Sequence, residues 1–168
     1  MVFALVVALV CVLLDRATKY LAAAFIGLGE SKIAIDGVLN FTYIRNEGMA
    51  FGLLSDKRYI FIIASVILLA AILVFLFIYR KQANVWFKAS CGLILGGGIG
   101  NMIDRIYLGY VIDFIDVRIL SFWKWVFNIA DACVCVGVGM FAVYLIYDAV
   151  KTEKENKRAE KETDEHDE

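Results

Sequence analysis

The stretch from Tyr59 to Tyr79 contains no charged residue, and Arg80 and Lys81 follow it directly. A helix needs roughly 20 predominantly apolar residues to cross the hydrocarbon core of a bilayer. Three further segments are also rich in apolar residues: 1–26, 89–106 and 126–147. The chain is 61% hydrophobic and has no proline, whereas soluble domains are about half apolar. These features predict an all-α integral membrane protein with four transmembrane helices in a single domain, residues 1–147.

Charged residues gather between and after the apolar segments. Residues 27–58 and 107–125 are predicted to form two extracytoplasmic loops, and residues 148–168 a charged, solvated cytoplasmic tail whose start could be helical. The 80–88 loop and the tail together hold more Lys and Arg than the two longer loops. This difference favours cytoplasmic termini under the positive-inside rule. No basic stripe along the chain suggests a nucleic-acid partner.

The first long loop contains a hairpin pattern. Two apolar segments, 32–35 and 38–44, flank Asp36 and Gly37, and such a dipeptide is typical of a two-residue β-turn. We therefore expect a small extracytoplasmic β-sheet that lies on the membrane. Residues 45–52 follow the hairpin, and their glycines permit tight turns. This segment is either an ordinary loop or a place where a ligand approaches the backbone closely.

Acidic side chains near the ends of apolar segments are the strongest functional signal. An ionisable group at membrane depth costs at least a few kcal/mol, so it marks a functional site with a partner. In an up-down bundle, Asp113 and Asp131 would lie at the same membrane face, and we expect them to face each other across a small cavity and share a proton. Such a pair titrates as a unit and can activate water. The only histidine, His166, lies in the tail, which argues against Ser-His-Asp chemistry.

Other charged residues are candidates for supporting roles. Asp15 and Lys19 are four residues apart, so they share a helix face and can pair. They form either a structural ion pair near the membrane surface or an anchor for the rim of the site. Asn101, Asp104 and Arg105 are expected on one face of the third span, with Asp104 and Arg105 as an ion pair at its end.

Small residues predict how the helices pack. Glycines recur at every fourth position of the third span, a pattern that lets helices approach backbone to backbone; they are Gly92, Gly96 and Gly100. We expect Gly137 and Gly139 of the last span to pack against this face. The four cysteines lie in apolar helical segments without metal-site spacing, so they are interpreted as packing residues rather than ligands. No metal or organic cofactor is expected.

Five short motifs occur in a fixed order along residues 1–147, and together they are specific: Asp15-Arg16-Ala17-Thr18-Lys19, Asn46-Glu47-Gly48-Met49-Ala50-Phe51, Gly100-Asn101-Met102-Ile103-Asp104-Arg105, Val111-Ile112-Asp113-Phe114 and Phe127-Asn128-Ile129-Ala130-Asp131. With these motifs the sequence resembles the lipoprotein signal peptidases (signal peptidase II). The resemblance implies a multi-pass enzyme of the bacterial cytoplasmic (inner) membrane, with both termini cytoplasmic and the active site toward the extracytoplasmic side. Its substrates would be diacylglyceryl-modified prolipoproteins, cut immediately before the lipidated lipobox cysteine.

The resemblance also implies roles for individual residues. The catalytic aspartates would be Asp113 and Asp131. Polar residues lining the substrate pocket would be Asn46, Gly48, Asn101, Arg105 and Asn128, with Asp15, Lys19 and Asp104 in support. The implied partners are the prolipoprotein substrates, membrane lipid and the cyclic peptide inhibitor globomycin. We expect a monomer.

Three alternatives remain open on the residues alone. A small transporter or proton channel could use the aspartates as a relay, but it would place acids near the middle of its spans. A membrane scaffold could use them to join helices, and Asp→Asn changes would then harm folding rather than turnover. A different intramembrane aspartic protease would carry a Gly-x-Gly-Asp signature, which this chain lacks.

Overall fold

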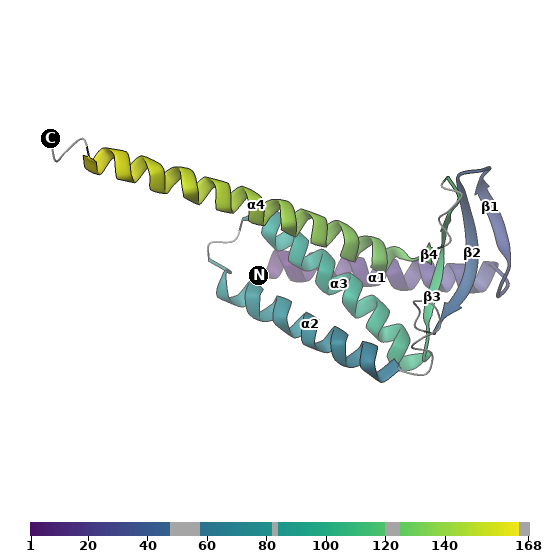
Figure 1. Cartoon of the computed structure of the whole chain (residues 1–168). Helices are drawn as coiled ribbons and strands as arrows, with labels where there is room; N and C mark the ends of the chain where they lie inside the picture. The colour runs from purple at the N-terminus through teal and green to yellow at the C-terminus, as the bar shows by residue number, and fades with distance from the viewer. Residues whose placement is uncertain (48–57, 82–83, 120–124, 165–168) are drawn as a thin grey trace.

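Four helices lie side by side lengthwise, and a small sheet covers one end of them (Figure 1). The computed structural model describes residues 1–47, 58–81, 84–119 and 125–164. The helices are α1 (Val2–Phe25), α2 (Arg58–Ile78), α3 (Val85–Tyr107) and α4 (Ile129–Asp164); the strands are β1 (Ser31–Ile35), β2 (Leu39–Asn46), β3 (Val111–Val117) and β4 (Val126–Phe127). Helix α1 begins, and α4 ends, on the side away from the sheet.

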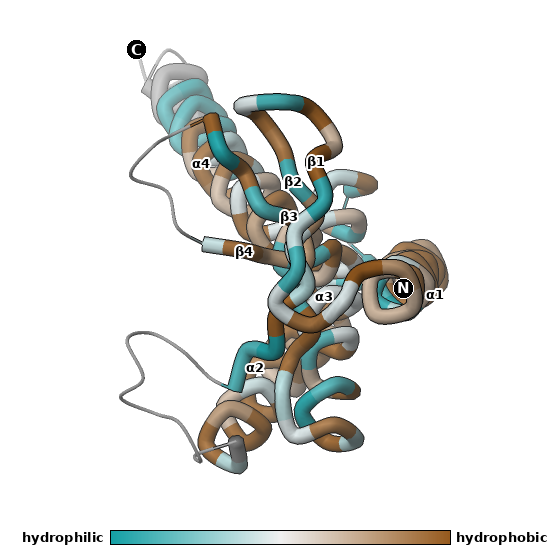
Figure 2. Tube along the Cα trace, turned by 90° about the vertical axis from the view of Figure 1, so that its right-hand side faces the viewer, coloured by the Kyte–Doolittle hydropathy of each residue, from teal (hydrophilic) through white to brown (hydrophobic). Residues whose placement is uncertain are grey.

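The helix surfaces are apolar where they face outward. Apolar colouring prevails along the helices in Figure 2, whereas the far end of α4 is hydrophilic. Leu9 and Leu13 of α1 and Ile67 of α2 are more than half exposed, and so large an apolar surface suits a lipid environment. Within the described ranges, two helices are long and apolar enough to cross a membrane by length and composition, α2 and α4. The mostly helical architecture is confirmed; four spans stay a prediction.

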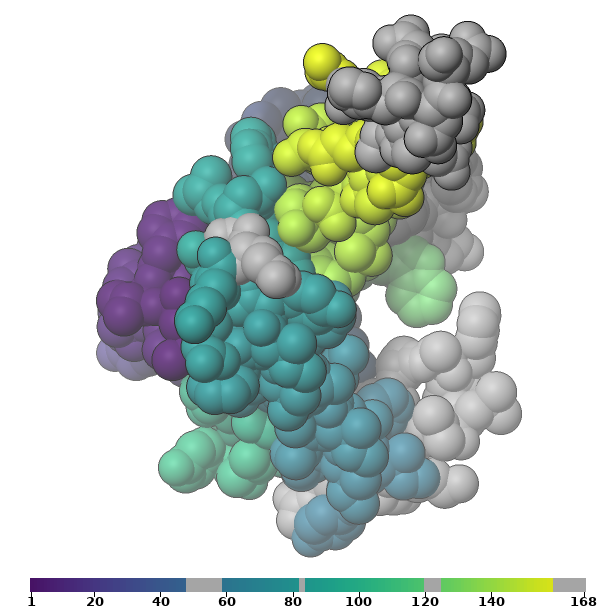
Figure 3. All heavy atoms as spheres, turned by 90° about the vertical axis from the view of Figure 1, so that its left-hand side faces the viewer, coloured from purple at the N-terminus to yellow at the C-terminus, as the bar shows by residue number. Residues whose placement is uncertain are grey.

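Helix α3 is the centre of the bundle. It contacts α1, α2 and α4, and Figure 3 shows it between α1 (purple) and α4 (yellow) at the end away from the sheet. The glycine face packs on α1, because a Cβ atom at Gly92 would lie 2.6 Å from the carbonyl oxygen of Ala4, and one at Gly96 would lie 2.7 Å from that of Ala8. This close approach of two backbones confirms the predicted role of the glycines.

The glycines of α4 pack differently from the expectation. Because α1 occupies the face of Gly92 and Gly96, α4 meets α3 beside Gly97 instead. Gly137 does pack on α3, because a Cβ atom added there would lie 3.0 Å from the carbonyl oxygen of Ser90. Gly139 has nothing within 4 Å of such a Cβ, so its predicted packing role was wrong.

An aromatic cluster holds the helices together at the end away from the sheet. The ring of Phe87 on α3 lies 5.6 Å from Phe75 on α2, and 5.8 Å and 5.3 Å from Phe141 and Tyr144 on α4. Helix α3 begins before the predicted residue 89 because the side chain of Asn84 accepts a hydrogen bond from the backbone N–H of Phe87, at 2.9 Å. This N-cap satisfies one of the free donors of the first turn.

The sheet is antiparallel, in the order β1-β2-β3-β4. The predicted hairpin is present, and Gly37 sits at its turn with a φ of 66°, a conformation that glycine adopts at little cost. Strand β3 was not predicted. Residues 107–125 were expected to form a loop, but Val111–Val117 pair with β2 along most of their length. Asp113 therefore lies on a strand.

Helix α4 begins later and ends later than predicted. Residues 126–127, expected in the fourth span, form β4, and the helix then continues through most of the predicted tail to Asp164. Exposed ion pairs one helical turn apart support this extension, with Lys157 2.6 Å from Glu153 and Lys151 3.7 Å from Glu155. The tail side chains are exposed over residues 151–158, as expected for a solvated segment.

Candidate active site

Asp113 and Asp131 come together because β3 crosses the end of the bundle where α4 begins. Asp113 lies at the middle of β3 and is 1% exposed, and Asp131 is half-buried in the first turn of α4. The described residues contain no direct hydrogen bond between the two carboxylates. Both are bound to asparagine side chains instead. The pair is therefore held by neutral amides.

Asn128 joins the two aspartates. Its side-chain Nδ2 donates to Asp113 Oδ1 at 2.6 Å, and its Oδ1 accepts a hydrogen bond from the backbone N–H of Asp131 at 2.9 Å. Asp131 Oδ2 in turn accepts from the backbone N–H of Asn128 at 3.2 Å. This reciprocal arrangement is a capping box at the start of α4. The same bonds that begin the helix thus orient Asp131 and attach it to Asp113.

Two further asparagines also donate hydrogen bonds to the aspartates, so that three asparagines form a ring of donors around the pair. Asn46, at the end of β2, donates to Asp113 Oδ2 at 2.8 Å. Asn101, on α3, donates to Asp131 Oδ1 at 2.7 Å, and its own oxygen lies 3.1 Å from Asn128 Nδ2. All three asparagines predicted to line the pocket therefore lie against the two aspartates. Gly48, predicted beside them, lies outside the described residues.

Burial makes Asp113 a weak acid. The pKa of Asp113 is raised to about 6, chiefly because burial removes the carboxylate from water and in part because of the negative charge of Asp131. The hydrogen bonds from Asn46 and Asn128 act in the opposite direction and lower this pKa. A carboxyl group with a pKa near 6 can give and take a proton near neutral pH. The predicted sharing of one proton between the two aspartates stays a prediction.

A cluster of full charges lies beneath the aspartates. The buried ammonium of Lys19 lies 2.9 Å from Asp15 Oδ2 and 2.8 Å from Asp104 Oδ2. It also donates to Asn101 Oδ1 at 2.9 Å, so the cluster connects directly to the ring of asparagines. Arg16, which is partly exposed, pairs with the other oxygen of Asp104. The pair of Asp15 and Lys19 expected from their spacing is present, and it is part of this larger group.

The cluster holds the backbone next to each aspartate. Asp15 Oδ1 accepts a hydrogen bond from the N–H of Ala130 at 3.0 Å, one residue before Asp131. Asp104 Oδ2 accepts from the N–H of Ile112 at 3.2 Å, one residue before Asp113. Two buried carboxylates thus fix the two chain segments that carry the pair. This arrangement agrees with a supporting role for Asp15, Lys19 and Asp104.

Arg105 does not pair with Asp104, and this prediction was wrong. Asp104 turns toward α1, where Lys19 and Arg16 neutralise it. The guanidinium carbon of Arg105 lies 5.3 Å from the ring centre of Phe61 on α2. Its Nη1 donates to the backbone carbonyl oxygen of Asn101, one turn earlier in α3, at 3.4 Å. Adjacent helix residues point about 100° apart, so one residue faces α1 and the next faces α2.

Two participants were not predicted from the sequence. Arg16 stands beside Asp15 in an otherwise apolar segment, and a second cation there is a signal for a second buried acid. Asp116, 3% exposed on β3, accepts from Thr42 Oγ1 at 2.7 Å and from Arg118 Nη2 at 2.6 Å. Within the described ranges, no group of three His, Cys, Asp or Glu side chains is arranged to hold a metal ion.

Comparisons with known proteins identify the family of the chain. The model of the signal peptidase (SPase) II family matches residues 7–147. The lipoprotein signal peptidase of Halalkalibacterium halodurans is 41% identical over 150 residues, which cover 89% of this chain and 96% of the relative. That of Staphylococcus aureus is 40% identical over 154 residues, covering 91% and 94%. A solved structure described as a bacterial membrane enzyme is 37% identical, with a TM-score of 0.78 over 87% of this chain and 88% of its own.

Fold and relatives together define a class: a mostly helical membrane enzyme that is a peptidase. The chain belongs to the signal peptidase II family, the lipoprotein signal peptidases. It is a peptidase of lipoprotein processing.

Proposed function

We propose that this enzyme cleaves diacylglyceryl-modified prolipoproteins immediately before the lipidated cysteine, with Asp113 and Asp131 as the catalytic pair. The observation that carries the proposal is the connection of both carboxylates to Asn128, with the pKa of Asp113 raised to about 6. Two nearby acids, one of which has a raised pKa, can divide the roles of acid and base.

The reaction follows from that division. Asp131, ionised, takes a proton from a water molecule while the oxygen of that water bonds to the scissile carbonyl carbon. Asp113, protonated, donates its proton to the carbonyl oxygen, so a neutral gem-diol forms. Asp131 then gives its proton to the leaving nitrogen as the carbon–nitrogen bond breaks. Asp113 recovers its proton from a gem-diol hydroxyl. The products are the signal peptide with a new carboxyl group and a lipoprotein with a free N-terminal cysteine.

The asparagines position the acids and meet the substrate. Asn128 and Asn101 bind the aspartates directly, so we assign them to orientation of the pair and to contact with the peptide around the scissile bond. Asn46, Gly48 and Arg105 are assigned to substrate contact as well. Arg105 interacts electrostatically with both aspartates, which suits a group that approaches a peptide carbonyl. Globomycin would occupy the same pocket, and the enzyme would work as a monomer.

The proposed topology has four spans in the cytoplasmic membrane. Helix α1 begins, and α4 ends, on the side away from the sheet, which suits cytoplasmic termini and an extracytoplasmic sheet. Three charged side chains of α1 and α3 lie in the buried cluster rather than toward lipid: Asp15, Lys19 and Asp104 are each at most 1% exposed. Their outward surfaces remain apolar, so charges within these helices do not prevent insertion.

The test is cleavage of a diacylglyceryl lipobox substrate in liposomes by the parent and by Asp113→Asn and Asp131→Asn. Each change keeps the shape of the side chain but removes the acid, and we expect a loss of about 10³-fold or more in turnover. The control is Asp148→Asn, an exposed acid on α4, which should leave cleavage unchanged. Folded variants that still cleave at the parental rate would overturn the assignment of that aspartate. Loss of folding in both would instead favour a scaffold role.

A further inference from the structure

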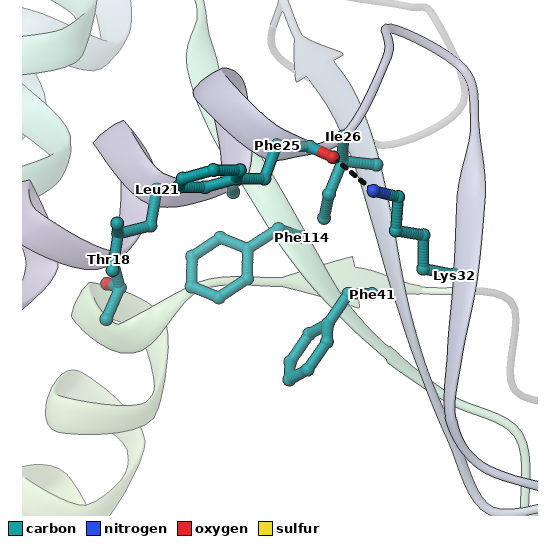
Figure 4. Close-up of a pocket in the computed structure, with 8 residues that line it drawn as sticks. Thr18, Leu21, Phe25, Ile26, Lys32, Phe41 and Phe114 are labelled. Atoms are coloured by element: carbon teal, nitrogen blue, oxygen red, sulfur yellow. Dashed lines mark hydrogen bonds between the residues drawn. The ribbon is translucent and has the colours of Figure 1, made fainter.

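An apolar cavity of about 330 Å³ lies between α1 and the sheet. Its size is in the range of small-molecule sites. Figure 4 shows the rings of Phe25 from α1, Phe41 from β2 and Phe114 from β3 around it, with Leu21 and Thr18 along the helix. Lys32 of β1 is the charged residue among those that line it.

Strand β3 separates this cavity from the aspartates. Successive side chains of a strand point to opposite faces. Asp113 faces Asn46 and Asn128, whereas Phe114 faces the cavity and packs with the end of α1. The cavity therefore lies behind the strand that carries a catalytic aspartate, and it is distinct from the site of hydrolysis.

The cavity is continuous with a surface suited to lipid. Leu21 is 51% exposed and Phe25 is 68% exposed, and both line the cavity. Helix α1 ends at Phe25, so the cavity lies where a spanning helix emerges into the interfacial region. A hydrocarbon chain from the bilayer can enter there without crossing water.

Lys32 adds a positive charge at the same place. Its Nζ donates to the carbonyl oxygen of Phe25 at 2.5 Å and so caps the C-terminus of α1. No carboxylate of the described residues lies within the 4.0 Å of an ion pair with this ammonium. Glu30, the nearest acid in sequence, turns its carboxylate toward Gly27. The ammonium has three donors, so two remain for an anion.

We propose that this cavity binds an acyl chain of an anionic phospholipid of the surrounding membrane, with the headgroup phosphate at Lys32. A lysine at the interface places its stem along apolar surface and its charge among the headgroups, which is the arrangement this occupant requires. The bound chain would contact Phe114 and so brace β3 against α1. The acyl chains of a substrate are the other possible occupant, and the position behind β3 favours the bilayer lipid.

Tryptophan quenching tests occupancy. The full chain with Phe41→Trp, reconstituted in detergent micelles, is titrated with phosphatidylglycerol brominated on its acyl chains, and the signal of the parent chain is subtracted. We expect quenching that saturates at low lipid fraction. The matched control is Leu13→Trp, which is on the outward surface of α1 and 59% exposed; its quenching should follow bulk lipid content. Indistinguishable curves for the two reporters would overturn the proposal.

Charge variants test the headgroup. In the Phe41→Trp background, Lys32→Gln should lower the apparent affinity for the brominated lipid about fivefold. This is the contribution of one basic residue near an anionic surface. Lys32→Arg should restore it, and Lys81→Gln, which lies just after α2 at the end of the bundle away from the sheet, should have no effect. No response to Lys32→Gln, or equal saturation by brominated phosphatidylcholine, would overturn the proposal. So would stoichiometric displacement of the brominated lipid by a diacylglyceryl lipobox peptide, which would make the cavity a substrate subsite.

Discussion

Two groups of buried acids lie close together in this protein, and their partners differ. Asp15 and Asp104 are neutralised by Lys19 and Arg16. Asp113, by contrast, is bound by the neutral amides of asparagines, as is Asp131. The first pair of acids therefore has full positive charges as partners, whereas the second has hydrogen bonds from neutral groups. The supporting and catalytic roles that we propose follow this difference.

Removal of one charge from the supporting cluster should have the largest effect on stability. In Lys19→Met, Asp15 and Asp104 would lose their shared buried cation, and an uncompensated buried charge costs about 3–5 kcal/mol. We expect a large fall in the thermal midpoint and loss of cleavage together. The control is Lys151→Met, whose partner Glu155 lies in an exposed pair and whose loss should change stability by about 0.5 kcal/mol or less. A stable but inactive Lys19→Met would place Lys19 in catalysis instead.

Asp113 should make stability depend on pH in the opposite direction from a paired acid. Its pKa is about 6 in the folded protein against 3.8 normally, so the folded state binds more protons. Stability from this group is present below about pH 4 and is lost as pH rises toward and through 6, by roughly 3 kcal/mol. Comparison of Asp113→Asn with the parent in denaturation between pH 4 and 8 isolates this effect. The variant should gain relative stability as pH rises, and parallel curves would contradict the raised pKa.

A substitution that crowds the supporting cluster should have a smaller effect on stability. In Gly100→Ala the new methyl group would lie 2.7 Å from Asp15 Oδ2 and 3.3 Å from the Cβ of Ala130. Overpacking of this kind costs about 1–3 kcal/mol, and thermal unfolding would measure it. Gly139→Ala is the control, because a Cβ there has nothing within 4 Å, and helix propensity favours alanine. Equal stability of the two variants would show that the helices can separate at Gly100 without penalty.

The two asparagine N-caps allow a matched comparison, with the smallest expected effect on stability. Asn128 caps α4 and binds Asp113, whereas Asn84 caps α3 far from the aspartates. Replacement of either by alanine should cost about 1 kcal/mol of stability. Only Asn128→Ala should also move the pH profile of cleavage upward, because Asn128 lowers the pKa of Asp113. The same profile for both variants would reduce Asn128 to a helix cap.

Sequence patterns predicted some local features well and missed others. The uncharged run of α2 and the turn at Gly37 were recognisable because each depends on neighbouring residues alone. Strand β3 was missed because Asp113 and Asp116 interrupt its apolar run, and the partner that pairs with it lies far earlier in the chain, on β2. Helix α4 was predicted to end with its apolar part, but ion pairs such as Lys157 with Glu153 continue it.

The sequence by itself determined the kind of molecule and the identity of its polar residues. An apolar chain with a few acids and asparagines has to bury those groups together, and its motifs are sufficient to indicate the family. Only the tertiary structure decided which acid meets which partner. Asp104 pairs with Lys19 across the bundle rather than with its neighbour Arg105, because the rotation of α3 about its axis aims adjacent side chains at different helices. That rotation is set by packing between distant segments, and no local pattern records it.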